Sequence, residues 1–196
     1  PDLSQSFNAI FAQLAADKRV KAPFRRYASG PYTAWFFPRP GAHRFNDPVY
    51  RALQSVKCRG AKNTPGGRTI VQVKMFTWNG NRGLTLAREL YKLDQAGCRV
   101  EVILGAPGAG AVREVRRPGR NGGIGVWDSR RDRNFDGELD LYTHMKMMSI
   151  KGRMGKNRKA KTVYTGSANW TQDAYTVGDE MVIRLNTGRA WRQYNR

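Results

Sequence analysis

Two short segments near the C-terminal end carry residues whose types and spacing could do chemistry. One is THMKMMSIK, in which His144 and Lys146 stand two residues apart, and the other is the tetrapeptide GSAN, which ends at Asn169. An extended strand places residues two apart on one face, so the imidazole and the ammonium should point the same way. An anion between the two groups would stabilise them, and a phosphate fits that need.

The residues in these segments could act on a bound phosphate in different chemical roles. The imidazole of His144 can act as nucleophile or general acid, and Lys146 can supply fixed positive charge to developing oxyanions. The turn at Gly166 and Ser167 is expected to expose a hydroxyl and backbone N–H groups, and Asn169 adds a neutral donor. Each segment alone is a weak indication of a phosphate site. Together, on adjacent predicted strands, they are a much more specific one.

This combination resembles the phospholipase D superfamily, whose pattern is His-x-Lys-x4-Asp followed by Gly-Ser-x-Asn. The matching positions are His144, Lys146, Gly166, Ser167 and Asn169. The later segment GDEMVIRL, with Glu180, is similar to the stretch that follows the motif in this family. One position departs from the pattern, because Lys151 stands where the family has Asp. On the strand alternation Lys151 points away from His144, so it should be a supporting residue.

The resemblance implies metal-independent hydrolysis of a phosphodiester through a phosphohistidine, with no cofactor required. One His attacks phosphorus, a second His from another copy of the motif protonates the leaving oxygen, and water completes the reaction. The residues that the resemblance makes catalytic are His144, Lys146 and Asn169. Those expected to bind substrate are Gly166, Ser167, Trp170 and Glu180, with Trp170 bordering the pocket.

A complete site of this kind needs a second lobe, because the chain carries one copy of the motif. The other histidine, His43, has Phe45 rather than Lys two residues on and is interpreted as a surface residue. Either two identical chains pair, or the chain is the C-terminal half of a two-lobe protein. The opening SQSFNAIFAQLAADK is similar to the helix that connects two lobes, which favours the second reading.

Hydrophobic periodicity predicts the elements that must position these residues. Apolar residues at helical spacing predict a helix over 4–19 capped by Ser4 or Ser6, and a second helix begins near Pro48 after Asn46 or Asp47. A strand at 68–76, a helix after it and a strand at 98–105 form a βαβ unit.

Three further strands, over 143–152, 159–167 and 179–185, complete the predicted sheet. The predicted fold is therefore an α/β class, three-layer α/β/α sandwich with a mixed central sheet. Residues 30–196 form one phospholipase D-like lobe, and residues 1–29 form an N-terminal helix and connector.

The charge of the chain points to a polyanionic partner. There are 35 Lys and Arg against 15 Asp and Glu, a net charge of +20, which attracts nucleic acid or an anionic membrane surface. A nucleic-acid backbone is the favoured substrate, and the basic run over 151–161 is expected to be a solvated hairpin loop. The alternatives are a phospholipase D that acts on lipid headgroups and an inactive lobe that binds polyanions or serves as a scaffold.

Two smaller features leave alternatives open. Cys58 and Cys98 either pair, closing a loop worth roughly 3–4 kcal/mol, or remain reduced thiols. The pair resembles that of exported family members, which favours a secreted or extracytoplasmic protein over a cytoplasmic one. The segment DRNFDGELD, residues 132–140, resembles the first half of an EF-hand loop, but Thr143 replaces the bidentate Glu. A structural calcium there is considered, and an acidic loop that neutralises neighbouring arginines is preferred.

Overall fold

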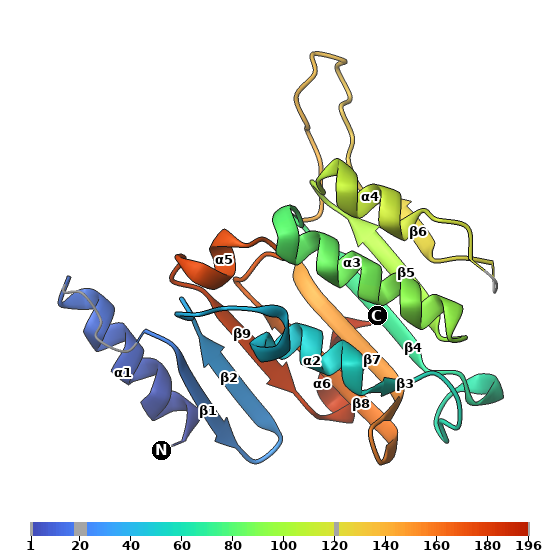
Figure 1. Cartoon of the computed structure of the whole chain (residues 1–196). Coiled ribbons are helices and arrows are strands. Elements are labelled where there is room, and N and C mark those ends of the chain that lie inside the picture. The colour runs from blue at the N-terminus through green and yellow to red at the C-terminus, as the bar shows by residue number, and fades with distance from the viewer. Residues whose placement is uncertain (1, 18–22, 120–121, 196) are drawn as a thin grey trace.

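A nine-stranded mixed sheet runs through the described part of the chain, residues 2–17, 23–119 and 122–195 of a computed structural model (Figure 1). The strands are β1 (Arg25–Ser29), β2 (Tyr32–Phe36), β3 (Val56–Lys57), β4 (Ile70–Met75), β5 (Arg99–Leu104), β6 (Gly125–Asp128), β7 (Lys146–Met154), β8 (Asn157–Gly166) and β9 (Met181–Leu185). Their order across the sheet is β1-β2-β9-β8-β7-β4-β5-β6, and β3 pairs with the end of β7.

The predicted βαβ unit is present and forms the parallel part of the sheet. β4 pairs in parallel with β5, and β5 with β6, while the remaining pairs are antiparallel. The connecting helix α3 (Gly80–Gln95) ends before Gly97, whose positive φ of 94° suits a glycine there. The mixed central sheet is thus confirmed.

Helices cover both faces of this sheet, as an α/β sandwich requires. α2 (Pro48–Ser55), α3 and α4 (Ala109–Val115) lie on one face, in front of the sheet in Figure 1. Behind it lies α6 (Gly188–Tyr194), whose Trp191 ring stacks under the ammonium of Lys151 at 4.9 Å. The remaining helices are α1 (Leu3–Ala15), α5 (Asp173–Thr176), η1 (Arg44–Asn46) and η2 (Pro65–Gly67).

Of the two predicted helix starts, that of α2 is confirmed and the cap predicted for α1 is wrong. Asp47 caps α2, accepting from the backbone N–H of Val49 at 2.8 Å, with Pro48 in the first turn as expected. The cap of α1 is Asp2, in a capping box with Gln5, so the prediction of Ser4 or Ser6 was wrong. The Asp-x-x-Gln spacing carries this signal in the sequence. The helix ends at Ala15, and residues 18 and 19 of the predicted range lie outside the described residues.

The observed strands differ in extent from two predictions, the start of the lobe and the loop over 151–161. β1 pairs with β2, so the sheet begins at Arg25, before the boundary placed between residues 29 and 30. The basic run over 151–161 is not a long hairpin loop, because β7 and β8 extend through it and leave only Gly155 and Lys156 between them. Lysine and arginine alternating on a strand pair can keep their charged ends in water, which composition alone does not reveal.

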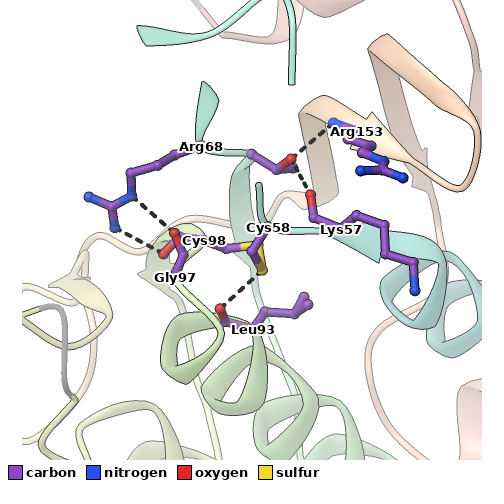
Figure 2. The surroundings of a disulfide bond; sticks show 8 residues. Lys57, Cys58, Arg68, Leu93, Gly97, Cys98 and Arg153 are labelled. Atoms are coloured by element: carbon purple, nitrogen blue, oxygen red, sulfur yellow. Dashed lines mark hydrogen bonds between the residues drawn. A yellow bond between two sulfur atoms is a disulfide. The ribbon is translucent and has the colours of Figure 1, made fainter. Parts of the chain in front are cut away.

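Cys58 and Cys98 form a disulfide bond, which settles the open alternative in favour of pairing (Figure 2). The bond joins the segment after β3 to the residue before β5, 40 residues on. Beside it the guanidinium of Arg68 donates to the carbonyl oxygens of Gly97 at 3.0 Å and Cys98 at 3.3 Å. These contacts hold the start of β5 against the loop that leads into β4.

None of the helices in the described ranges is long and apolar enough to cross a membrane.

Candidate active site

An open cleft of about 590 Å³ lies where β7 begins and β8 ends, and most predicted site residues meet there. Its lining residues are His144, Met145, Lys146, Thr165, Gly166, Ser167, Asn169 and Glu180. Of the seven residues predicted for the site, only Trp170 is absent from this lining. Antiparallel pairing explains the meeting, because Met147 of β7 faces Thr165 of β8 and brings the two motif segments side by side.

His144 stands just before β7 rather than within it, since the strand begins at Lys146 and not at Thr143. Its exposed ring packs against Phe76, with ring centroids 4.4 Å apart. The segment before it crosses Gly105 so closely that a Cβ there would lie 2.5 Å from the Thr143 carbonyl oxygen. The backbone N–H of Thr143 also donates to the Ser129 hydroxyl at 2.9 Å. These contacts, rather than the hydrogen bonds of a strand, hold the backbone before His144 and so position its imidazole.

Lys146 points to the same side as His144. Its Nζ atom lies 3.0 Å from each ring nitrogen of His144 and 3.0 Å from the His144 carbonyl oxygen. The ammonium also lies 5.1 Å from the centre of the Phe76 ring, a cation–π distance. Burial lowers the pKa of Lys146 below its usual range, and the nearby carboxylate of Glu180 opposes that shift.

Asn169 is held so that its amide NH₂ group is left for a ligand. Its Oδ1 atom accepts from the backbone N–H of Thr77 at 3.3 Å, which fixes which end of the amide faces the protein. The Asn169 carbonyl oxygen accepts from the guanidinium of Arg82 at 2.6 Å. Arg82 in turn pairs with Asp47 at 2.8 Å, and both side chains are almost fully buried, at 4% and 3% exposure.

The Gly-Ser turn differs from the prediction in one respect. The backbone N–H groups of Ser167 and Ala168 both donate to the carbonyl oxygen of Met181, at 3.1 and 3.3 Å, so they are not free to bind a phosphate. The Ser167 hydroxyl accepts from the Met181 N–H at 3.0 Å and keeps its own proton to donate. Gly166 is needed because its φ is +144° and a Cβ would lie 2.1 Å from the Met181 oxygen.

Trp170 belongs to the core, although we expected it to border the pocket. Its side chain is 2% exposed and meets Trp78 edge to face, with ring centroids 5.2 Å apart. One residue after Asn169, it belongs to the same buried core cluster as Trp78 and Leu86 of α3. Lys151, at the position of the family Asp, lies on the α6 face, away from His144, as the alternation predicted.

Glu180 lies at the cleft and His43 lies away from it. Glu180 is half-buried and lines the cleft, and its backbone carbonyl oxygen accepts from the Phe37 N–H at 2.8 Å, so its backbone is anchored there. His43 is exposed before η1 and lines a different cavity with Arg82 and Tyr175, not the cleft.

The loop over 132–140 satisfies its carboxylates locally. Asp132 accepts from the N–H groups of Phe135 at 2.7 Å and Gly137 at 3.0 Å, and Asp140 accepts from that of Arg133 at 2.6 Å. Within the described ranges, no three His, Cys, Asp or Glu side chains are grouped to hold a metal ion.

Several residues that shape the cleft were missed by sequence reasoning. Phe76, Thr77, Arg82 and Gly105 lie 40 to 90 residues from the motif segments and carry no motif signal of their own. Phe76 and Thr77 do follow directly after β4, where a strand ends at the same edge as the start of β7. That adjacency is the one signal that could have found them.

Comparison with known proteins places the chain in a family. Residues 67–196, about two thirds of the chain, match the profile described as "Cardiolipin synthase, PLD-like domain". A search of curated proteins gave no match.

Three solved structures are similar to the chain. NucT from Helicobacter pylori is 13% identical with a TM-score of 0.55, covering 84% of this chain and 90% of that one. Polyphosphate kinase from Porphyromonas gingivalis is 13% identical with a TM-score of 0.54, covering 83% of this chain and 22% of that one. The phospholipase D family member Nuc from Salmonella typhimurium is 18% identical with a TM-score of 0.49, covering 84% and 88%. The profile match establishes that the chain belongs to the phospholipase D-like domain family.

Proposed function

We propose that the protein hydrolyses phosphodiesters without a metal, with His144 as the nucleophile. The observation that carries this proposal is the meeting of His144, Lys146, Ser167 and Asn169 around one open cleft. Family membership supports phosphodiester chemistry of this kind.

In the proposed reaction an imidazole nitrogen of His144 attacks phosphorus, and the P–O bond to the leaving group breaks. The leaving oxygen takes a proton from a second histidine. Water then attacks the phosphohistidine, the P–N bond breaks, and the second histidine recovers a proton from the water. Lys146 and the amide of Asn169 hold the phosphoryl oxygens, and Lys146 must turn from the imidazole to do so.

The second histidine is proposed to come from another lobe. His43 lies outside the cleft, so the described chain supplies one histidine to the site. We favour an N-terminal lobe of a longer protein over a second copy of this chain, because α1 carries a partly exposed apolar face at Phe7, Phe11 and Leu14. A partner lobe would cover such a face.

A nucleic-acid backbone is the proposed substrate. The net charge of +20 attracts any polyanion, and the cleft is open enough to admit a chain rather than a single small ester. Binding that rests on phosphate contacts should weaken steeply with salt and depend little on base sequence.

One observation favours a second candidate, a phospholipid. An apolar groove of about 250 Å³ adjoins the cleft at Ser167 and Glu180 and continues between α1 and β2. Its walls include Phe7, Ile10 and Phe36, which could receive an acyl chain while the headgroup phosphate reaches His144. This substrate would place the protein on a membrane surface.

The two substrates are separated by one experiment. The chain is incubated in EDTA with plasmid DNA and, separately, with phosphatidylcholine vesicles, alone and with a candidate N-terminal lobe. His144→Ala is the test variant, and His43→Ala is the matched control because it removes the other histidine outside the cleft. DNA cleavage lost in His144→Ala and kept in His43→Ala supports the nuclease.

Lipid turnover with the same dependence would support the phospholipase instead. If neither substrate is turned over, with or without the candidate N-terminal lobe, the proposal that the protein is an enzyme is contradicted. Binding of DNA without cleavage would then support an inactive polyanion-binding lobe.

A further inference from the structure

A further cavity, of about 600 Å³, lies between α2 and the β1-β2-β9-β8 half of the sheet. Its floor is the sheet face that carries Trp35 of β2, Arg184 of β9 and Tyr164 of β8. α2 forms one wall, and the turn between β7 and β8 lies at one end. The volume is that of a small-molecule site.

Arg184 occupies an unusual position in this floor. It sits on an interior strand, paired with Thr33 on one side and Tyr164 on the other. Its guanidinium donates to the Thr33 hydroxyl at 2.8 Å, but its buried Nε atom has no hydrogen-bond partner among the described residues. Among the described residues Arg184 forms no ion pair, and a half-buried guanidinium without a counter-ion is costly, so a bound anion would stabilise it.

Three more arginines line the same cavity. Arg39 donates to the Asn46 carbonyl oxygen at 2.8 Å and lies over the Phe24 ring at 4.1 Å, while Arg26 and Arg51 are exposed at the rim. No Asp or Glu belongs to the lining within the described ranges, and the ion pairs found there include none of these four arginines. The cavity therefore concentrates positive charge that the chain does not neutralise.

The floor also offers aromatic surface. The Trp35 and Tyr164 rings lie nearly parallel, 18° apart, with centroids 6.3 Å from each other, and Arg184 lies over Trp35 at 6.0 Å. A planar ring can pack on such a floor while the guanidinium groups bind phosphates with paired N–H donors.

This cavity is separate from the cleft. Along β8 it takes in Ala160, Thr162 and Tyr164, whereas the cleft begins at Thr165, and the two linings share no residue. A ligand in the cavity therefore need not touch His144.

We propose that this cavity binds a small molecule that carries several phosphate groups and a planar ring, of the nucleoside triphosphate class. Four arginines without a carboxylate match an oligophosphate, and the aromatic floor matches the base. The walls of α2 and the sheet favour a compact molecule over a nucleic-acid strand.

Isothermal titration calorimetry tests this proposal, with ATP, tripolyphosphate and adenosine as probes, in EDTA and about 0.15 M salt. We expect saturable binding of one ATP per chain, weaker binding of tripolyphosphate and none of adenosine. Arg184→Gln should weaken ATP binding about tenfold or more through the loss of charge-assisted hydrogen bonds. Arg51→Gln should also weaken it, and because Arg51 is exposed this variant tests the site without disturbing the fold.

Two controls make the result specific. Arg192→Gln removes an exposed arginine on α6, behind the sheet, and should leave ATP binding within about twofold, as should His144→Ala. Equal weakening by Arg192→Gln would show that the net charge of the chain, and not this cavity, accounts for ATP binding. Loss of binding in His144→Ala would show that ATP binds in the cleft. Either result, absence of saturable binding, or tighter binding of an oligonucleotide with the same dependence on Arg184 would overturn the proposal.

Discussion

Lys146 has several partners in the cleft, and they set the conditions under which it can work. Its ammonium lies 3.0 Å from the His144 ring nitrogens and within cation–π reach of Phe76, and the Glu180 carboxylate acts on it from across the cleft. Burial favours the neutral amine, whereas Glu180 favours the ammonium. The proposed role requires the ammonium, so the balance between the two effects should appear in the pH dependence.

The first prediction concerns that pH dependence. Because the pKa of Lys146 is lowered from the usual 10.5, the ammonium is lost at a lower pH than in an ordinary lysine. Turnover should therefore fall on the alkaline side below pH 10.5, and Glu180→Gln should move that fall to still lower pH. A pH profile of kcat/KM measures it, with the exposed neighbour variant Asp179→Asn as control. An alkaline limb that Glu180→Gln leaves in place would contradict the assignment.

Gly166 shows that a motif residue can serve packing rather than chemistry. Gly166→Ala should destabilise the fold by more than the ~1–2 kcal/mol that a positive φ alone costs, since the new Cβ would overlap the Met181 carbonyl oxygen. Gly155→Ala is the matched control, because Gly155 also has a positive φ but its Cβ would meet nothing within 4 Å. Urea denaturation compares the two variants, and equal losses would show that close approach of β8 to β9 is unimportant.

At the scale of elements, the loop after β8 is held by two helices on the front of the sheet. Arg82 of α3 donates to the carbonyl oxygen of Asn169 and pairs with Asp47, which also caps α2. Gly83 allows this approach, because a Cβ there would lie 2.8 Å from the Trp170 carbonyl oxygen. The position of Asn169 therefore depends on how α2 and α3 pack.

Breaking this ion pair should be costly in both stability and activity. Arg82→Met leaves the buried Asp47 carboxylate without its counter-ion, an effect of roughly 3–5 kcal/mol, and it should lower kcat by loosening Asn169. Arg88→Met, on the same helix, removes an arginine whose pair with Glu114 is exposed, and should cost about 1 kcal/mol or less. Thermal denaturation and turnover of both variants check this, and similar losses would mean that the buried pair does not organise the loop.

The sequence predicts the sheet and the motif segments well because their signals are local. Alternating and continuous apolar runs mark β4, β5 and β8, and GSAN follows β8 directly. The surroundings of the site are not local. Phe76 reaches His144 and Arg82 reaches Asn169 only after the strands pair, and Trp170 turns inward because Trp78 receives it. The prediction of free backbone amides at the Gly-Ser turn was wrong for the same reason, since the amides of Ser167 and Ala168 donate to the carbonyl oxygen of Met181 in β9.

At the scale of the whole molecule, a disulfide and a large positive charge set the conditions in which the protein can work. The bond between Cys58 and Cys98 supports our proposal of a secreted or extracytoplasmic location, since such bonds persist in oxidising compartments. The charge of +20 makes binding to any polyanion dependent on ionic strength.

Removal of the disulfide should lower stability without changing the cleft. The bond closes a 40-residue separation, for which chain entropy gives roughly 3–4 kcal/mol. The double variant Cys58→Ala/Cys98→Ala should lose about this much free energy of unfolding yet keep turnover at temperatures where it stays folded. Denaturation of the wild-type chain with and without reductant provides the control, and a stability unchanged by reductant would contradict the expectation.

The most direct test of the central claim is to trap the covalent intermediate. The protein, with its second lobe where one is required, is mixed with a phosphodiester substrate in EDTA, quenched and analysed by mass spectrometry. We predict a phosphoryl adduct on His144, and a loss of turnover of roughly a thousandfold or more in His144→Ala but not in His43→Ala. Turnover that survives His144→Ala, or an adduct on another residue, would contradict the account.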